Sequence, residues 1–154
     1  MRKFKFKFET VATVKKRAED AALRALGIAQ QAYHLALRNK QNILNQLMDS
    51  LDRREDLGQA GVFASAFQLE NNFIAGTKQR VIQADQQIMK MQRNVEKALR
   101  AFLFARKQTR TIEVLREKEM AEFKKAAQKR EQKELDDFYI MRRNSEAMQE
   151  RFSG

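Results

Sequence analysis

The sequence contains no proline and no cysteine, and only five of its 154 residues are glycine. Proline costs about 3 kcal/mol in a helix interior, so its absence removes the strongest helix breaker. Without cysteine the chain can form no disulfide and no thiolate nucleophile or metal ligand. Two of the glycines, Gly58 and Gly61, lie close together and separate two long stretches of good helix formers. We therefore expect a chain that is helical over most of its length.

Long apolar runs are missing as well. No run of about 18 apolar residues occurs, so we expect no transmembrane helix. The N-terminal Met1-Arg2-Lys3-Phe4 is basic, but alternating charge follows it instead of the apolar core of a signal peptide. These features predict a cytoplasmic protein.

Catalytic and cofactor-binding motifs are also absent. His34 is the only histidine, and with no cysteine beside it the chain lacks the usual metal clusters and catalytic triads. No glycine-rich phosphate-binding loop is present. The acidic residues between Glu117 and Asp137 alternate with basic ones at helical spacing, which is typical of surface ion pairs. We predict no enzymatic activity, no metal, no cofactor and no small-molecule substrate.

The net charge of +11 is unevenly distributed. Seven basic residues lie between Lys90 and Arg110, with Glu96 as the one acidic residue among them. Such an excess attracts acidic proteins, nucleic acid or anionic membrane surfaces, although it is also found on the solvated flank of a coiled coil. Basic and acidic residues are interleaved over most of the chain, and no helix-turn-helix or basic zipper region appears, which argues against nucleic acid as the partner. The basic N-terminal segment is the candidate for membrane contact.

The first half of the chain has a heptad pattern. The alternating Lys/Phe residues 3–8 taken alone would indicate a strand, but helical spacing begins within them. The members of the predicted seam are Phe4, Phe8, Val11, Lys15, Ala18, Ala22, Ala25, Ala29, Ala32, Ala36, Asn39 and Ile43. Steps of four and three residues are typical of a coiled coil. We predict a helix over about 8–53, with Gly27 as its weak point.

The second half shows the same periodicity with larger side chains. Its predicted seam is Ile88, Met91, Val95, Ala98, Phe102, Ala105, Thr109 and Ile112, continued less regularly by Leu115, Met120, Phe123, Ala127, Arg130, Leu135, Phe138 and Met141. We predict a turn over 54–61, a short helix over about 62–75 and a long helix over about 78–148. Ser65 and Gln68, which have the spacing of a capping box, support the short helix.

The predicted fold class is all-α. We expect residues 1–154 to form one coiled-coil domain, a long antiparallel two-helix hairpin with a short extra helix in the connection. Such a hairpin offers no pocket, so the chain would act by contacting other macromolecules. A structural homodimer, in which the seams pair between two chains, is an alternative.

Two segments carry a family resemblance. The opening Phe4-Lys5-Phe6-Lys7-Phe8-Glu9-Thr10-Val11-Ala12-Thr13-Val14-Lys15 resembles that of the flagellar FliJ family, including a glutamate at the position of Glu9. The segment Gln132-Lys133-Glu134-Leu135-Asp136-Asp137 resembles the C-terminal Leu/Met-Asp-Glu pattern of the same family. The length of the chain, its two predicted long helices and its central aromatic segment also agree with this family. The stalk proteins of virulence type III secretion share this outline.

The resemblance implies a cytoplasmic component of the flagellar type III export apparatus, associated peripherally with the inner membrane at the flagellar base. Its implied partners are the hexameric export ATPase, the export-gate membrane protein and export chaperones. The paired terminal helices of this family resemble the central stalk, or gamma subunit, of rotary ATP synthases. The alternative function is a basic coiled coil that binds nucleic acid or acts as a structural homodimer.

The same resemblance implies two sets of binding residues. The ATPase-binding set is Phe4, Phe6, Phe8, Val11, Phe123, Arg130, Lys133, Leu135, Phe138, Arg142 and Arg143. The export-gate set is Ile43 and Phe73, which match an aliphatic and an aromatic position of the family. This chain departs from the family pattern at Gln46, Ser50, Thr77 and Arg80.

Overall fold

The computed structural model describes residues 2–61 and 63–154. Two helices account for nearly all of these residues, and none of the described residues is in a strand: α1 spans Glu9–Gln59 and α2 spans Ala64–Ser153. The prediction of an all-α chain with two long packed helices is confirmed. Two units can be distinguished, the hairpin unit Lys16–Arg106 and the terminal unit Met1–Lys15 with Lys107–Gly154.

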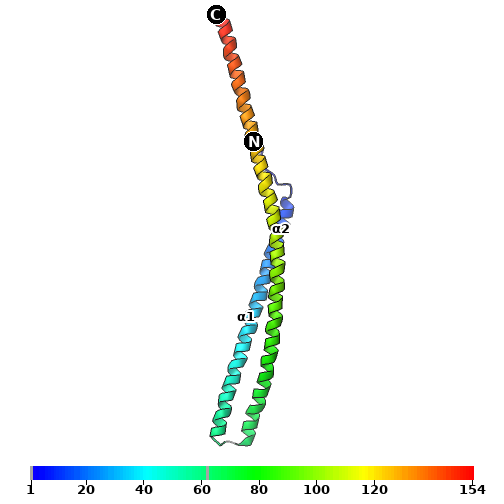
Figure 1. Ribbon diagram of the computed structural model, residues 1–154, viewed down its shortest axis with the longest axis vertical. Coiled ribbons are helices and arrows are strands. Elements are labelled where there is room, and N and C mark those ends of the chain that lie inside the picture. The colour runs from blue at the N-terminus through cyan, green and yellow to red at the C-terminus, as the bar shows by residue number, and fades with distance from the viewer. Residues whose placement is uncertain (1, 62) are drawn as a thin grey trace. The chain divides into compact units, whose positions relative to one another are not determined.

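In the hairpin unit, α1 and α2 run antiparallel and side by side (Figure 1). Polar contacts between the helices fix their register along the unit. They are the Lys40–Asp85 ion pair, Arg80–Gln46 at 3.1 Å, Arg54–Asn71 at 3.2 Å and Arg53–Glu70 at 3.4 Å. All lie at least partly in solvent, so each contributes about 0–1 kcal/mol and serves mainly to specify the pairing.

The apolar seam of α2 lies where the sequence predicts it. Six members belong to the hairpin unit, and all are half-buried: Ile88, Met91, Val95, Ala98, Phe102 and Ala105. Towards the turn the same steps continue through Ala84, Thr77 and Ile74, which are buried. The heptad therefore reflects packing against α1.

Within the hairpin unit the predicted seam of α1 is correct in part. Ala22, Ala29, Ala36 and Ile43 face α2, Ala32 is half-buried beside them, and Ala18, Ala25 and Asn39 are exposed. Glu19, Leu26, Tyr33 and Lys40 take the positions between the members that face α2. The predicted and the observed series share Ala22, Ala29, Ala36 and Ile43, which are seven residues apart, and differ in the residues between them. The observed series prevails because burying Leu26 or Tyr33 removes more apolar area from water than burying an alanine. The seam is thus less alanine-rich than predicted.

The turn is shorter than the prediction. Residues 54–59 belong to α1, and the reversal lies after Gln59, where Gly61 has a φ of 67°. The charged residues before Gly58 are compatible with a helix, because Arg53 and Arg54 extend from α1 and bond to residues of α2.

No separate short helix occurs among the described residues after the turn. Residues 64–75 form the start of α2, and residue 62 of the predicted helix lies outside the described residues. The Phe63 carbonyl accepts a hydrogen bond from the Ala66 amide at 3.0 Å, so the helix begins before Ser65. Helix α2 continues without a bend past Thr77. The Thr77 hydroxyl donates a hydrogen bond to the Phe73 carbonyl at 2.8 Å, so this buried hydroxyl has its partner within the helix.

Two glycines are expected to respond in opposite ways to alanine. Gly27 lies inside α1, and a Cβ there would meet nothing within 4 Å, so Gly27→Ala should stabilise the chain by about 0.5–1 kcal/mol. Gly61 has a positive φ, so Gly61→Ala should destabilise it by about 1–2 kcal/mol. Urea denaturation followed by circular dichroism measures both. Shifts in the same direction would contradict this account of the turn.

In the terminal unit, the N-terminal segment packs on α2. The rings of Phe4 and Phe123 lie 5.5 Å apart, and Phe6 is buried, with the Arg116 guanidinium 5.9 Å from its ring. Arg116 also pairs with Glu9 at 3.4 Å, which ties the first turn of α1 to α2. Residues 2–6 form no strand.

Beyond this contact α2 continues as a single helix, as Figure 1 shows for residues of the terminal unit. All residues from 128 to 154 are exposed. We call residues 128–153 the tail helix, which is about 39 Å long. The predicted continuation of the seam to Phe138 and Met141 therefore has no partner helix among the described residues.

Candidate protein-binding site

The described residues leave much of the chain's surface exposed. Its accessible surface is 12979 Å², whereas a globular monomer of this mass exposes about 8,100 Å². Within the described residues, no three metal-binding side chains come together, and neither helix has an apolar stretch able to cross a bilayer. Functional candidates are therefore exposed apolar side chains, which mark interaction sites when they are contiguous.

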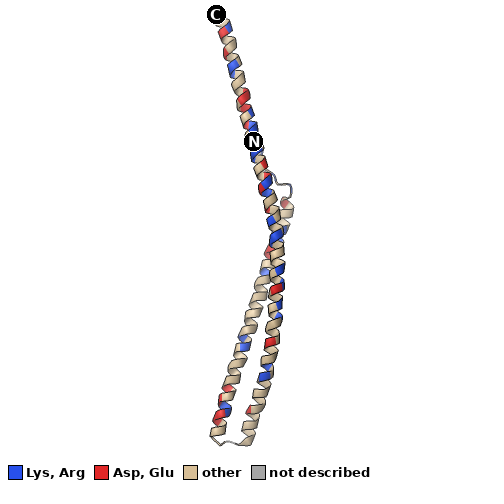
Figure 2. Cartoon of the chain, viewed as in Figure 1, with Lys and Arg blue, Asp and Glu red and all other residues tan. Residues whose placement is uncertain are grey.

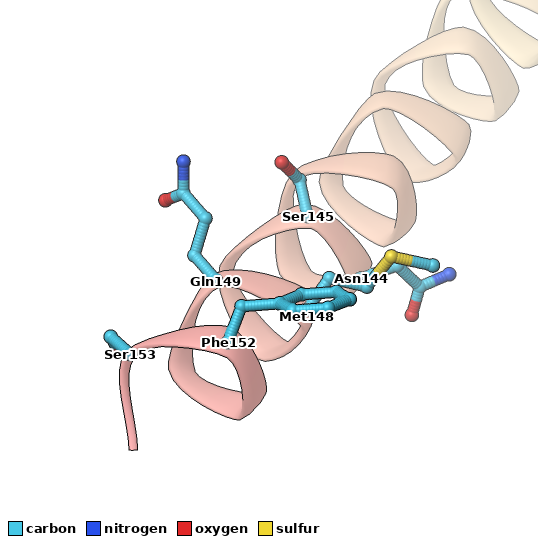
Figure 3. A pocket seen from close by; sticks show the side chains of 6 residues that line it. All are labelled: Asn144, Ser145, Met148, Gln149, Phe152 and Ser153. Atoms are coloured by element: carbon cyan, nitrogen blue, oxygen red, sulfur yellow. The ribbon is translucent and has the colours of Figure 1, made fainter.

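A shallow hollow lies near the end of the tail helix (Figure 3). Its lining residues are Asn144, Ser145, Met148, Gln149, Phe152 and Ser153, all on one helix and all exposed. Figure 3 shows the Met148 and Phe152 side chains lying next to each other. Because no second element closes the hollow, it is a part of the helix surface and not a ligand pocket.

Tyr139 and Ile140 are exposed apolar residues of the tail helix, but most of the others follow a single stripe. Its members are Phe138, Met141, Ser145, Met148 and Phe152, at steps of three and four, with Leu135 at its start. Phe138 is 63% exposed and Phe152 is 88% exposed. The seam predicted from the sequence ends at Met141 and omits Met148 and Phe152, although steps of three and four residues continue through Ser145 to both. We call these six residues the tail stripe.

Six predicted ATPase-binding residues lie on the tail helix and are exposed: Arg130, Lys133, Leu135, Phe138, Arg142 and Arg143. Arg142 pairs with Glu146 at 3.2 Å, and the Arg130 Nε donates to the Ala126 carbonyl at 3.4 Å. Both side chains remain in solvent, so these contacts are weak enough to exchange for a partner.

The other predicted ATPase-binding residues have a different environment. Phe4, Phe6 and Phe123 are brought together, but they are buried or half-buried and hold the N-terminal segment on α2. Phe8 and Val11, at 36% and 40% exposed, keep part of their surface in water. In the terminal unit, Phe4, Phe6 and Phe123 therefore pack within the chain, whereas Phe8 and Val11 are partly exposed.

The two predicted gate-binding residues also differ. Ile43 is 5% exposed and lies in the seam between α1 and α2, so a partner can reach little of it. Phe73 is 45% exposed, and Leu69, one helical turn before it, is 72% exposed. Sequence reasoning missed Leu69. We call Leu69 and Phe73, with the hydrogen-bonded pair Gln46 and Arg80, the Phe73 patch.

One protein family matches most of this chain. The family model for the flagellar FliJ protein matches residues 4–147. No curated protein matches the chain. A solved structure described as a YscO homolog from Chlamydia trachomatis is 18% identical, with a TM-score of 0.48, and the match covers 90% of this chain and 94% of that one.

Proposed function

Because the chain belongs to the FliJ family, coiled-coil proteins associated with type III protein export, we propose that it is a stalk-like component of the flagellar export apparatus. In this proposal the terminal unit binds the hexameric export ATPase. The observation that carries the proposal is the tail stripe, an apolar surface along a helix that has no partner among the described residues.

The tail helix has the properties of a helix that inserts into a groove or ring. Anchors at steps of three and four residues are typical of an amphipathic helix bound in an apolar groove. A helix with its side chains is about 10–12 Å across, which suits a narrow central opening. The exposed Arg130, Lys133 and Arg142 supply positive charge for acidic groups around such an opening.

The N-terminal segment has a supporting role in this proposal. Phe4 and Phe6 pack on α2 just before the tail helix begins, so they fix the base from which it extends. Phe8 and Val11 add exposed apolar area beside that base. We propose that these two residues touch the ATPase, while Phe4, Phe6 and Phe123 act through packing.

Copurification with the export ATPase tests the proposal. We expect the purified chain to co-elute with the ATPase in gel filtration and to stimulate its ATP hydrolysis. A variant that ends at Ala127 keeps the packed part of the terminal unit and should lose both effects. If ATPase assembly and turnover are the same with and without the full chain, the proposal fails.

We also propose that the Phe73 patch binds the export-gate membrane protein, with Ile43 supporting it from within the seam. Phe73→Ala should leave the helix content unchanged, because the side chain is only half-buried, and weaken gate binding about tenfold. Surface plasmon resonance against the cytoplasmic part of the gate measures this. Ile82→Ala, a similarly exposed position on α2, is the control. Equal affinities for Phe73→Ala and the wild type would remove Phe73 from the site.

The remaining family properties extend the proposal. We propose association with export chaperones because the family resemblance implies it. A position in the cytoplasm at the inner membrane of the flagellar base follows from the gate and ATPase contacts that we propose. Sedimentation with membranes that contain the gate, and its loss in Phe73→Ala, would support this location.

A further inference from the structure

One part of the hairpin unit is almost free of acidic residues. From Ala21 to Met48, α1 contains no aspartate or glutamate, and from Gln86 to Arg106, α2 contains only Glu96. The basic residues of these two stretches are Arg24, Arg38, Lys40, Lys90, Arg93, Lys97, Arg100 and Arg106. Lys40 pairs with Asp85, whereas none of the others forms an ion pair with a described residue.

The turn end of the same unit has the opposite charge. Between Asp49 and Glu70 there are five acidic residues against two basic ones, Arg53 and Arg54. Figure 2 shows acidic residues on α1 near the turn and basic residues along α2 farther from it. The cations far from the turn therefore have few anions of their own chain nearby, and a partner with acidic groups would be attracted there.

The Gln46–Arg80 hydrogen bond identifies which residues share one side of the hairpin. Positions seven residues apart stay on the same side of a coiled coil. Counting back from Gln46 gives Asn39, Ala32, Ala25 and Ala18, and counting forward from Arg80 gives Gln87, Asn94 and Ala101. Away from the turn, this side is therefore lined with small side chains next to the seam.

Larger residues border these small ones on the same side. Three residues after Ala25 and Ala32 on α1 come Ile28 and Leu35, and three residues after Asn94 and Ala101 on α2 come Lys97 and Phe104, with Lys90 one heptad before Lys97. Ile28 is 68%, Leu35 60% and Phe104 64% exposed. We call Ala25, Ile28, Ala32, Leu35, Lys90, Lys97, Ala101 and Phe104 the alanine face.

We propose that the alanine face docks a third helix, supplied by a protein partner whose apolar stripe is flanked by aspartate or glutamate. Small residues allow a helix to approach closely, at an interaxial distance of about 8–10 Å. Ile28 and Leu35 on one border and Phe104 on the other would then cover its apolar stripe. Lys90 and Lys97 lie two helical turns apart, about 10.5 Å, and match acidic residues at the same spacing on a partner helix.

The apolar content of the face favours a helix over nucleic acid. Phosphates would pair with Lys90 and Lys97, but the exposed side chains of Ile28, Leu35 and Phe104 would gain little against a phosphate backbone. The surface also goes beyond the proposed function, because it uses neither the tail stripe nor the Phe73 patch. Lys90 is about 25 Å along α2 from Phe73.

Fluorescence anisotropy with designed peptides tests the proposal on the full-length chain. The first probe is a helical peptide of about four heptads, with leucine along one stripe and glutamate on both flanks. The second probe is the same peptide with lysine in place of glutamate. We expect the glutamate peptide to bind at least about tenfold more tightly than the lysine peptide.

Two double variants locate the bound peptide. Ile28→Ser with Leu35→Ser removes apolar area, and Lys90→Glu with Lys97→Glu reverses the charge, so each should weaken binding of the glutamate peptide about tenfold or more. The matched controls are Leu23→Ser with Leu37→Ser, elsewhere on α1, and Lys124→Glu with Lys125→Glu, in the terminal unit. Both controls should retain binding within about twofold. Circular dichroism confirms that every variant keeps its helices.

Three results would overturn the proposal. Equal binding of the two peptides would exclude charge recognition, and equal losses in the controls would place the contact elsewhere. The third is tighter binding to a DNA duplex of about two helical turns, or to phosphatidylglycerol vesicles, that is lost in Lys90→Glu with Lys97→Glu but kept in Ile28→Ser with Leu35→Ser. That pattern would assign the face to nucleic acid or to an anionic membrane.

Discussion

The double variant Leu135→Ala with Phe138→Ala is expected to lose copurification with the export ATPase while its melting temperature stays that of the wild type. Both side chains are more than half exposed, so their removal opens no cavity in the chain. In the proposed complex they fill apolar pockets, and two such anchors contribute about 2 kcal/mol or more each. The dissociation constant should therefore rise by a factor of about several hundred or more. Isothermal titration calorimetry measures this rise.

A matched control separates this effect from a general loss of apolar surface. Ile82→Ala with Met89→Ala removes two exposed apolar side chains from α2 in the hairpin unit. This control should bind the ATPase as the wild type does. If Leu135→Ala with Phe138→Ala also binds like the wild type, the tail stripe is not the ATPase contact.

The second large effect concerns stability. Ile43 and Ile74 are 5% and 3% exposed and belong to the thin seam of the hairpin unit. Ile43→Ala or Ile74→Ala should lower the free energy of unfolding by about 2–5 kcal/mol, from lost burial and the cavity left behind. Native proteins have a free energy of unfolding of about 5–15 kcal/mol, so this loss would be a large fraction of the total. Urea denaturation followed at 222 nm would detect it.

The control for this prediction is Ile28→Ala, because Ile28 is largely exposed on the same helix. Its effect should stay within about 0.5 kcal/mol. A small effect of both Ile43→Ala and Ile74→Ala would mean that the helices do not pack through these residues. The melting temperature also separates loss of packing from loss of a direct gate contact. Ile43→Ala should lower the melting temperature, whereas Phe73→Ala should not.

The α2 seam could be predicted from the sequence because apolar residues, among them the large Val95 and Phe102, recur there at steps of three and four. In α1, alanines occur both in the seam and beside it. The periodicity of Ala22, Ala29 and Ala36 is therefore compatible with two series, and only the position of α2 decides between them. Local composition was also insufficient for the turn, since charged residues can end a helix or lie on its surface.

The candidate sites show a related limit. Phe4, Phe123 and Phe138 have similar chemistry and all follow helical spacing, yet the first two pack on each other and the third is exposed. A sequence does not distinguish an apolar side chain that faces a neighbouring helix from one that faces another protein. Here the distinction depends on which part of α2 the N-terminal segment covers, and only the three-dimensional structure shows that.

Photo-crosslinking from single positions tests most directly the claim that the tail helix is the ATPase-binding element. Benzoylphenylalanine would replace Phe138 in the tail stripe or, in a second protein, Leu69 in the Phe73 patch, and each would be irradiated with the assembled ATPase. The account predicts a covalent adduct with the ATPase from position 138 and none from position 69. An adduct from position 69 with none from position 138 would contradict it.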